Sequence, residues 1–301
     1  MITLYPKPEF AASKHGRPAS HAKRSPLKYD SVLTTSQIKA EARRLLAGGL
    51  PSRIWYAVDL LSAGGVLSAT YLGIQERMLR HWSRFGLFER LQVSPQEVKD
   101  YYEKLGLQDG DPALYVLGPI GVEIATQRHE VLPPSGYQGY STMRVMHDLM
   151  TNEVVLRLAD RLGASGYAVE WLGKYEITLS DKAGNTILEP DALLRYRKDG
   201  WEYAFVLEYH NEDKQTRAIE KVKRYEAAYE SGNWGERWEV ETFPPVLAVF
   251  WHAIVGMGYT HMTKDRRVKC SYYGKTLKAL LEGKTEEWLL IATKERKKLI
   301  E

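Results

Sequence analysis

The first half of the chain shows short amphipathic segments separated by turns that contain glycine. The stretch "TTSQIKAEARRLLAGG" predicts a helix that Ser36 caps and Gly48-Gly49 ends. A second helix is predicted after Pro51, and Ser68 is a candidate cap for a further short helix. The next helix lies in "IQERMLRHWSRFGLFERLQ", and its apolar side comprises Met78, Leu79, Trp82 and Phe85.

The segments after this helix are typical of β-strands. "FGLFERLQ" leaves the helix at Gly86 as an apolar, strand-like run, and "PALYVLGPIGVEIA" predicts a strand at 114–117, a turn and a helix. Helices followed by a β-hairpin predict a winged helix-turn-helix domain over 31–126. Its third helix would offer to a DNA groove Gln75, Arg77, Arg80, His81 and Arg84. Two alternatives stay open, a winged helix that contacts proteins and an arginine-rich face that is only solvated.

The second half has a different pattern. A Pro- and Gly-containing stretch at 127–140 reads as a linker. "STMRVMHDLMTNEVVLRLADRLGASG" predicts a long helix, and three runs at 167–180, 191–197 and 202–210 predict strands. A charged helix at about 213–230 and a buried strand in "PPVLAVFWHAI" follow. This order predicts an α/β domain over 141–301, with a mixed sheet flanked by helices, so the whole chain is α+β.

Acidic and basic side chains gather around one predicted hairpin of this domain. Asp191 precedes the first strand, Lys198-Asp199-Gly200 supplies the turn, and the returning strand ends with Glu208-Tyr209-His210. Strands of about eight residues bring Glu208 back alongside Asp191 if the pairing is antiparallel. Alternation then puts Glu208 and His210 on one face. The hairpin therefore predicts a shared site, with a capped surface hairpin as the plain alternative.

The helix, three strands, helix, strand order resembles the core of the PD-(D/E)XK nuclease superfamily. The resemblance implies that Asp191 and Glu208 hold a magnesium or manganese ion, with Glu153 on the preceding helix as a third carboxylate. His210 stands where the nuclease pattern has lysine, and it is a candidate base or manganese ligand. Lys221, on the flank of the next helix, is the candidate replacement for that lysine. A catalytically dead site is the alternative.

Composition narrows the class of protein. The chain has 301 residues and 44% hydrophobic content, enough for one large domain or two ordinary ones. It lacks the run of about 20 apolar residues that a membrane helix needs, and its one cysteine, Cys270, excludes an intrachain disulfide. These features favour a cytoplasmic protein with no membrane partner. The formal net charge is +4, and residues 1–30, with six basic and two acidic side chains, predict a disordered basic tail that either contacts DNA or only aids solubility.

Both halves together resemble the replication-relaxation family of bacterial plasmids and mobile elements, which pairs a winged helix with a PD-(D/E)XK-like domain. The motifs that carry the resemblance are "GGVLSATYLG", "RFGLFERL", "HDLMTNEVVLRL", "EPDALLRY", "FVLEYH" and "EKVKRYEAAYE". By position, the resemblance implies that the family's motif residues correspond here to His147, Asn152, Asp191, Glu208, Lys221 and Tyr225. Family members commonly have Glu-x-Asp where this chain has Glu208-Tyr209-His210.

The resemblance implies work on double-stranded DNA in replication, mobilisation or relaxation. Three functions follow as hypotheses: a DNA-binding accessory protein that acts with a relaxase or replication protein, a magnesium- or manganese-dependent DNA nuclease, and a transcription regulator whose second domain only dimerises. Winged helices often act in pairs, so a homodimer is compatible with each of them.

Overall fold

The computed structural model describes residues 1–8, 33–104, 113–264 and 268–299. The chain divides into two compact units. The N-terminal unit is Lys7–Leu149, and the C-terminal unit combines Met1–Pro6 with Met150–Glu301. Within the described ranges, no helix has both the length and the apolar character needed to cross a bilayer.

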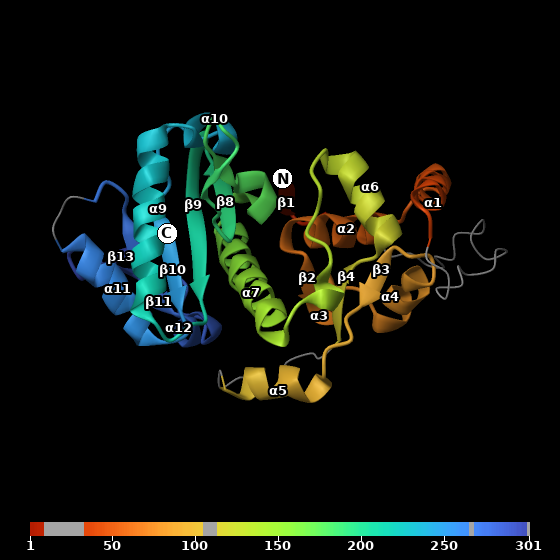
Figure 1. Ribbon diagram of the computed structural model, residues 1–301, viewed down its shortest axis with the longest axis horizontal. Coiled ribbons are helices and arrows are strands. Elements are labelled where there is room, and N and C mark those ends of the chain that lie inside the picture. The colour runs from red at the N-terminus through yellow and green to blue at the C-terminus, as the bar shows by residue number, and fades with distance from the viewer. Residues whose placement is uncertain (9–32, 105–112, 265–267, 300–301) are drawn as a thin grey trace. The chain divides into compact units, whose positions relative to one another are not determined.

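The N-terminal unit consists of short helices and a small sheet (Figure 1). Its elements are α1 (Thr35–Gly48), α2 (Ser52–Gly64), β2 (Val66–Ser68), α3 (Ala69–Leu72), α4 (Glu76–Ser83), β3 (Phe88–Arg90), α5 (Pro95–Lys104), β4 (Leu114–Leu117), α6 (Pro119–His129), the 3₁₀ turn η1 (Tyr137–Gly139) and the first part of α7 (Thr142–Ala164). The strands pair antiparallel in the order β2-β4-β3. From α2 to β4, the helices and strands follow the order that the sequence predicts for a winged helix, with β2 and α5 as additional elements that were not predicted.

The apolar pattern of the sequence explains how these elements pack. Leu79, Trp82 and Phe85 are buried beside β3, whereas Met78 is only half-buried. Ser68 caps α3 as predicted, since its Oγ accepts a hydrogen bond from the Tyr71 amide at 3.4 Å. The alternation of buried and exposed positions along α4 leaves its polar side in solvent.

The C-terminal unit is built on an eight-stranded mixed sheet. Its elements are β1 (Ile2–Tyr5), the rest of α7, β5 (Ala168–Gly173), α8 (Lys174–Ile177), β6 (Leu179–Ser180), β7 (Thr186–Leu188), β8 (Ala192–Lys198), β9 (Trp201–His210), α9 (Gln215–Ser231), α10 (Trp234–Trp238), β10 (Val246–Phe250), α11 (Ala253–Thr263), β11 (Tyr272–Thr276), α12 (Leu277–Leu281), β12 (Glu287–Leu290) and β13 (Glu295–Lys298). The strand order is β1-β5-β8-β9-β10-β11-β12-β13, and β10 pairs parallel with both β9 and β11. The long helix, β8, β9, α9 and β10 follow the predicted order. The run at 167–180, predicted as one strand, is a strand only in part, because helix α8 separates β5 from the two-residue strand β6.

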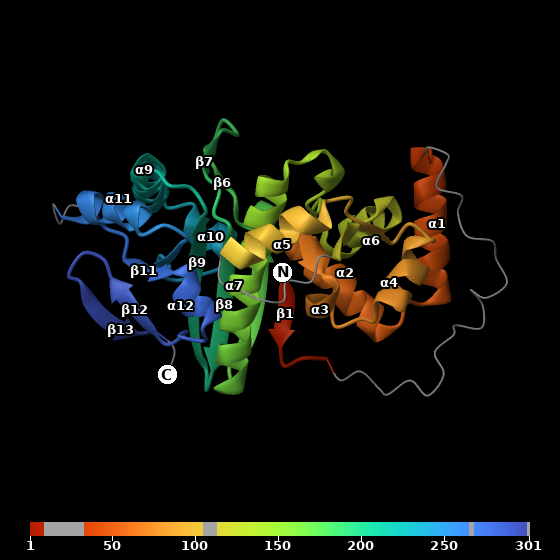
Figure 2. The ribbon, with the colours of Figure 1, turned by 90° about the horizontal axis from the view of Figure 1, so that it is seen from below.

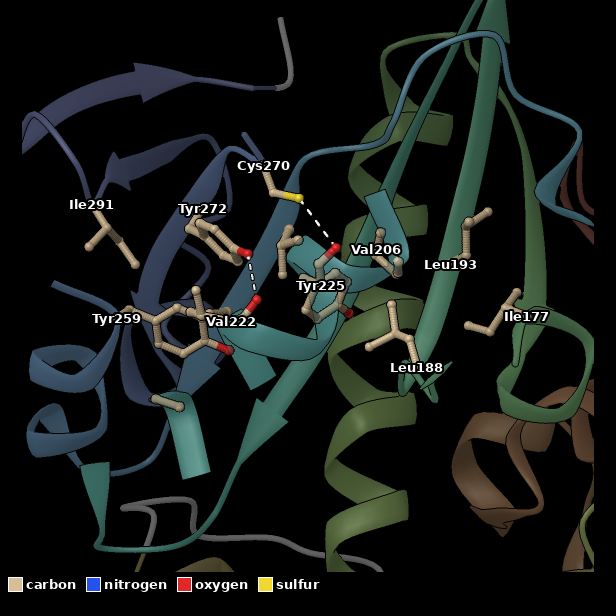
Figure 3. Close-up of a cluster of buried hydrophobic side chains, with 14 of the residues drawn as sticks. Ile177, Leu188, Leu193, Val206, Val222, Tyr225, Tyr259, Cys270, Tyr272 and Ile291 are labelled. Atoms are coloured by element: carbon tan, nitrogen blue, oxygen red, sulfur yellow. Dashed lines mark hydrogen bonds between the residues drawn. The ribbon is translucent and has the colours of Figure 1, made fainter. Parts of the chain in front are cut away.

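Helices cover both faces of this sheet. Figures 1 and 2 show α7 and α9 on opposite sides of β8 and β9. A large apolar cluster fills the space between the sheet and helices α9 and α11 (Figure 3). Within it, Tyr225 and Tyr259 are fully buried, and the Tyr272 hydroxyl donates to the Val222 carbonyl at 3.4 Å. This cluster fixes α9 against the strands that carry the predicted acidic pair.

The structure corrects three expectations. Residues 2–5 are not part of a disordered tail, because they form β1, which pairs antiparallel with β5 and buries Ile2 and Leu4. Most of the predicted tail, from residue 9 to residue 30, lies outside the described residues. The first helix is capped by Thr34 instead of Ser36, through a capping box with Gln37. The division between units falls inside α7 instead of at 127–140, where Tyr137 is buried and its hydroxyl donates to Asp148 at 3.0 Å.

Candidate functional site

The β8–β9 hairpin brings the two predicted carboxylates together. Its register pairs Ala192 with Leu207, which places Asp191 opposite Glu208. The backbone continues this pairing one step further, because the Asp191 amide donates to the Leu207 carbonyl at 3.2 Å. The Asp191 side chain is fixed as well, since its Oδ2 accepts a hydrogen bond from the Tyr209 amide at 2.8 Å.

The turn of the hairpin explains why this register forms. Asp199 and Gly200 join the strands with φ angles of 53° and 84°. Two consecutive left-handed residues are typical of the tight turns whose twist matches that of antiparallel strands, and Asp-Gly is a preferred sequence for them. A turn fixed at Asp199-Gly200 sets the pairing at the other end of the strands, where Asp191 and Glu208 lie.

Helix α9 supplies two polar partners for Glu208. Lys221 Nζ lies 2.7 Å from Glu208 Oε2 and 2.9 Å from Oε1, and the Tyr225 hydroxyl donates to Oε1 at 2.7 Å. Lys221 and Tyr225 are four residues apart, which puts them on one face of the helix. Lys221 also donates to the Glu189 carbonyl at 3.0 Å. We refer to Asp191, Glu208, Lys221 and Tyr225 as the Glu208 cluster.

Burial dominates the electrostatics of this cluster. Only 1% of Glu208 is exposed, and burial raises its pKa above the usual value, while the charge of Lys221 opposes the rise. Burial alone would lower the pKa of Lys221, but the charges of Glu208 and Asp191 outweigh it, so this pKa is raised. Burial and then the Glu208 charge raise the pKa of Tyr225 well above its usual value. Tyr225 therefore stays protonated and remains a hydrogen-bond donor.

His210 lies on the same face as Glu208 but has other partners. Its side chain is buried, with Nε2 2.9 Å from the Tyr259 hydroxyl and Nδ1 3.3 Å from Glu212 Oε1. The ring also meets the Tyr259 ring edge-on, with centroids 5.6 Å apart. Both ring nitrogens are thus engaged by α11 and by the residues that follow β9. His210 therefore links the end of β9 to α11.

The predicted third carboxylate is elsewhere. Glu153 is on α7, on the other side of the strands from α9 (Figure 2), and its Oε1 accepts from Arg157 Nη2 at 2.9 Å. Among the described residues, no group of three or more His, Cys, Asp or Glu side chains is arranged to hold a metal ion. The Glu208 oxygens accept hydrogen bonds from Lys221 and Tyr225 instead. The arrangement as it stands does not fit the oxygen-rich set that magnesium or manganese requires.

The two remaining family positions lie on α7. His147 Nδ1 is 3.1 Å from Asp148 Oδ1, and the same Asp148 side chain accepts the Tyr137 hydroxyl. Asn152 is buried, with 3% of its surface exposed. His147 falls in the N-terminal unit and Asn152 in the C-terminal unit, on either side of the division within the helix.

The five residues predicted to face DNA are mostly in solvent. Gln75, Arg77, Arg80 and Arg84 are exposed. Arg80 pairs with Glu76 at 3.1 Å and still keeps 65% of its side chain exposed. His81 differs, because it is half-buried and its ring meets Phe85 edge-on at 5.3 Å. The exposed side of α4 thus presents three guanidinium groups together with Gln75.

The sequence does not predict the part that some residues play in the site. Glu189 acts through its backbone carbonyl, which any residue type would supply. Tyr259 of α11 contacts His210 of β9 although the two residues are 49 positions apart in the sequence. The one signal that the sequence does hold is the i, i+4 spacing of Lys221 and Tyr225 on a helix that follows the acidic strand.

Comparison with known proteins identifies the family. No curated protein and no solved structure matches the chain. A family model described as replication-relaxation matches residues 74–242, more than half of the 301 residues. The match begins just before α4 and includes the β8–β9 hairpin and α9, and therefore the whole Glu208 cluster. The chain belongs to the replication-relaxation family.

Proposed function

We propose that this protein is a DNA-binding accessory factor in the replication or relaxation of a plasmid or mobile element, and that α4 reads double-stranded DNA. The observation that carries the proposal is the exposed side of α4, with Arg77, Arg80 and Arg84 in solvent. Membership of the replication-relaxation family supports the wider role.

The geometry of α4 suits a DNA groove. Its apolar residues, Leu79 and Trp82, are buried against the unit, so the opposite side is held outward by packing. Guanidinium groups bind phosphates and the O6 and N7 atoms of guanine. A helix whose rear face is fixed in the core presents such groups with little loss of backbone conformational entropy on binding.

The test is a salt titration of duplex binding. Removal of one arginine that binds a phosphate should reduce the slope of log K against log salt by about 0.9. A variant combining Arg77→Gln, Arg80→Gln and Arg84→Gln should therefore bind labelled duplex DNA more weakly and with a slope shallower by about 2 to 3. Fluorescence anisotropy at salt concentrations from about 50 to 200 mM measures both quantities.

Arg43→Gln provides the control, because Arg43 is exposed on another helix, α1, and the substitution removes one guanidinium charge, against three in the triple variant. It should leave the slope within error of the parent protein. If the triple variant and the control behave alike, α4 does not contact DNA and the proposal is wrong.

A second candidate function is cleavage of DNA by the Glu208 cluster. The specific observation in its favour is that two carboxylates in register and a lysine gather at the end of β9. Against it, no three His, Cys, Asp or Glu side chains of the described residues are arranged to hold a metal ion. Supercoiled plasmid incubated with magnesium, with manganese and with EDTA tests this function. Nicking that needs metal, and that both Asp191→Ala and Glu208→Ala abolish, would support it, whereas intact plasmid in both metals would exclude it.

A further inference from the structure

The last strands of the C-terminal unit border an open cavity that is separate from the Glu208 cluster. It has a volume of about 690 Å³ and is lined by residues of β11, α12, β12 and β13 and of the turn between α12 and β12. This volume falls in the range of pockets that hold small ligands. Its charged lining residues are Lys275, Lys284, Glu286, Glu287 and Arg296. All of them come after residue 242, so the cavity lies outside the part of the chain that matches the family.

Lys275 is the buried charge of this cavity. Only 9% of the residue is exposed. Its Nζ donates to the Lys284 carbonyl and lies 4.9 Å from the centroid of the Trp288 ring. In the described part of the chain, Lys275 forms no salt bridge with a carboxylate. A buried ammonium with one carbonyl and one ring as partners keeps unused donor capacity.

The acids of the cavity are paired with other cations. Glu286 forms a salt bridge with Arg161 of α7, and Glu287 lies 3.5 Å from Arg296. Burial lowers the pKa of Lys275 to about 8; Glu287 and Glu286 oppose this shift and the Arg296 charge adds to it. The nearby carboxylates therefore offset only part of the cost of burying the charged Lys275 side chain, and an anion in the cavity would stabilise that charge.

We propose that this cavity binds a phosphate group, carried by a nucleotide or by a nucleic-acid strand. Lys275 provides the buried positive charge. Lys284 and Arg296 add exposed cations to the lining, with 70% and 79% of their side chains exposed, and each also pairs with a carboxylate, Glu282 at 2.8 Å and Glu287 at 3.5 Å. Phosphate suits this lining, because it carries negative charge and offers several strong acceptor oxygens to a buried ammonium and to two further cations. The proposal does not depend on DNA binding by α4.

Isothermal titration calorimetry of the full chain tests the site with three probes: inorganic phosphate, a nucleoside monophosphate and a single-stranded oligonucleotide. Lys275→Met should weaken binding of at least one probe by about tenfold or more, because a charge-assisted hydrogen bond is removed. Lys278→Met is the matched control, since Lys278 is exposed on α12 and is not a lining residue. It should leave all three affinities unchanged.

The three probes separate the sources of the phosphate. Weaker binding confined to the oligonucleotide assigns the site to a DNA or RNA backbone, and weaker binding of the nucleoside monophosphate or phosphate assigns it to a free ligand. The triple α4 variant should bind the nucleoside monophosphate normally, so a failure of DNA binding by α4 is distinguishable. If Lys275→Met does not fold, Lys284→Gln combined with Arg296→Gln replaces it. No detectable binding of any probe, or equal binding by parent and variants, overturns the proposal.

Discussion

Removal of the positive charge beside Glu208 is the sharpest perturbation of the candidate site. Lys221→Met retains the length of the side chain but leaves the Glu208 carboxylate, 1% exposed, without its counter-charge. Breaking a buried ion pair by deleting one partner typically costs about 3–5 kcal/mol. Tyr225 still donates to Glu208, and 25% of the Lys221 side chain is exposed, so water can replace part of the interaction. We therefore expect the free energy of unfolding to fall by about 3 kcal/mol.

Urea unfolding followed by tryptophan fluorescence measures this decrease. Trp171, Trp238 and Trp288 are buried in the C-terminal unit and report on it. With an m-value of about 3 kcal/mol/M, the midpoint should fall by about 1 M. Lys223→Met, an exposed position on the same helix, makes the same change and should shift the free energy by less than about 0.5 kcal/mol.

The pH dependence gives this prediction a second, independent readout. Because the folded pKa of Glu208 is raised, the folded state binds its proton at higher pH than the unfolded state does. Lys221→Met removes an opposing charge and raises that pKa further. The difference between parent and variant should thus shrink as the pH is lowered from about 8 to about 5, because a protonated Glu208 needs no counter-charge. A difference that is equal for Lys221→Met and Lys223→Met, or constant over this range, would refute the assignment of Lys221 as the partner of Glu208.

Three further predictions concern single groups. Tyr225→Phe removes the hydroxyl that donates to Glu208 at 2.7 Å and should cost about 1.5–3 kcal/mol in urea unfolding, whereas Tyr229→Phe on the same helix should cost less than about 0.5. Gly200→Ala places a side chain at a φ of 84° and should cost roughly 1–2 kcal/mol, seen as a lower thermal midpoint; an unchanged midpoint would contradict the tight turn. The folded pKa of Lys275, about 8, lies below its unfolded value, so the folded state binds fewer protons between pH 8 and 10.5 and stability from this group rises over that window. Lys275→Met should lack that rise when urea midpoints are compared at about pH 7.5 and about pH 9.5.

The β8–β9 hairpin was predictable because its information is local. An Asp-Gly turn, two runs of matching length and an acid at each far end specify the register almost without tertiary context. The pairing of Ala192 with Leu207 then follows from counting back from the turn. The same locality explains why the strand at Leu114–Leu117 was predicted with its observed bounds.

Features that depend on distant partners escaped the sequence. β1 is only four residues long, and its alternation of buried Ile2 and Leu4 becomes meaningful only beside the edge of β5, more than 160 positions away. Helix α5 was missed because its run of polar side chains gives few apolar positions for a periodic pattern. Asp199 and Gly200 could be read locally, whereas the direction in which Lys221 points depended on where α9 packs.

The Glu208 cluster also sets a condition for the second candidate function, the cleavage of DNA. A divalent cation at Glu208 would need the oxygens that now accept from Lys221 and Tyr225. Metal binding and the ion pair therefore compete for the same carboxylate, and the stability of the pair opposes the metal. Lys221→Met would release Glu208 from this competition while it destabilises the fold. If Lys221→Met increases the affinity for the metal, the ion pair blocks a metal site in the parent protein. If the affinity does not change, the Glu208 cluster is a structural anchor between β9 and α9.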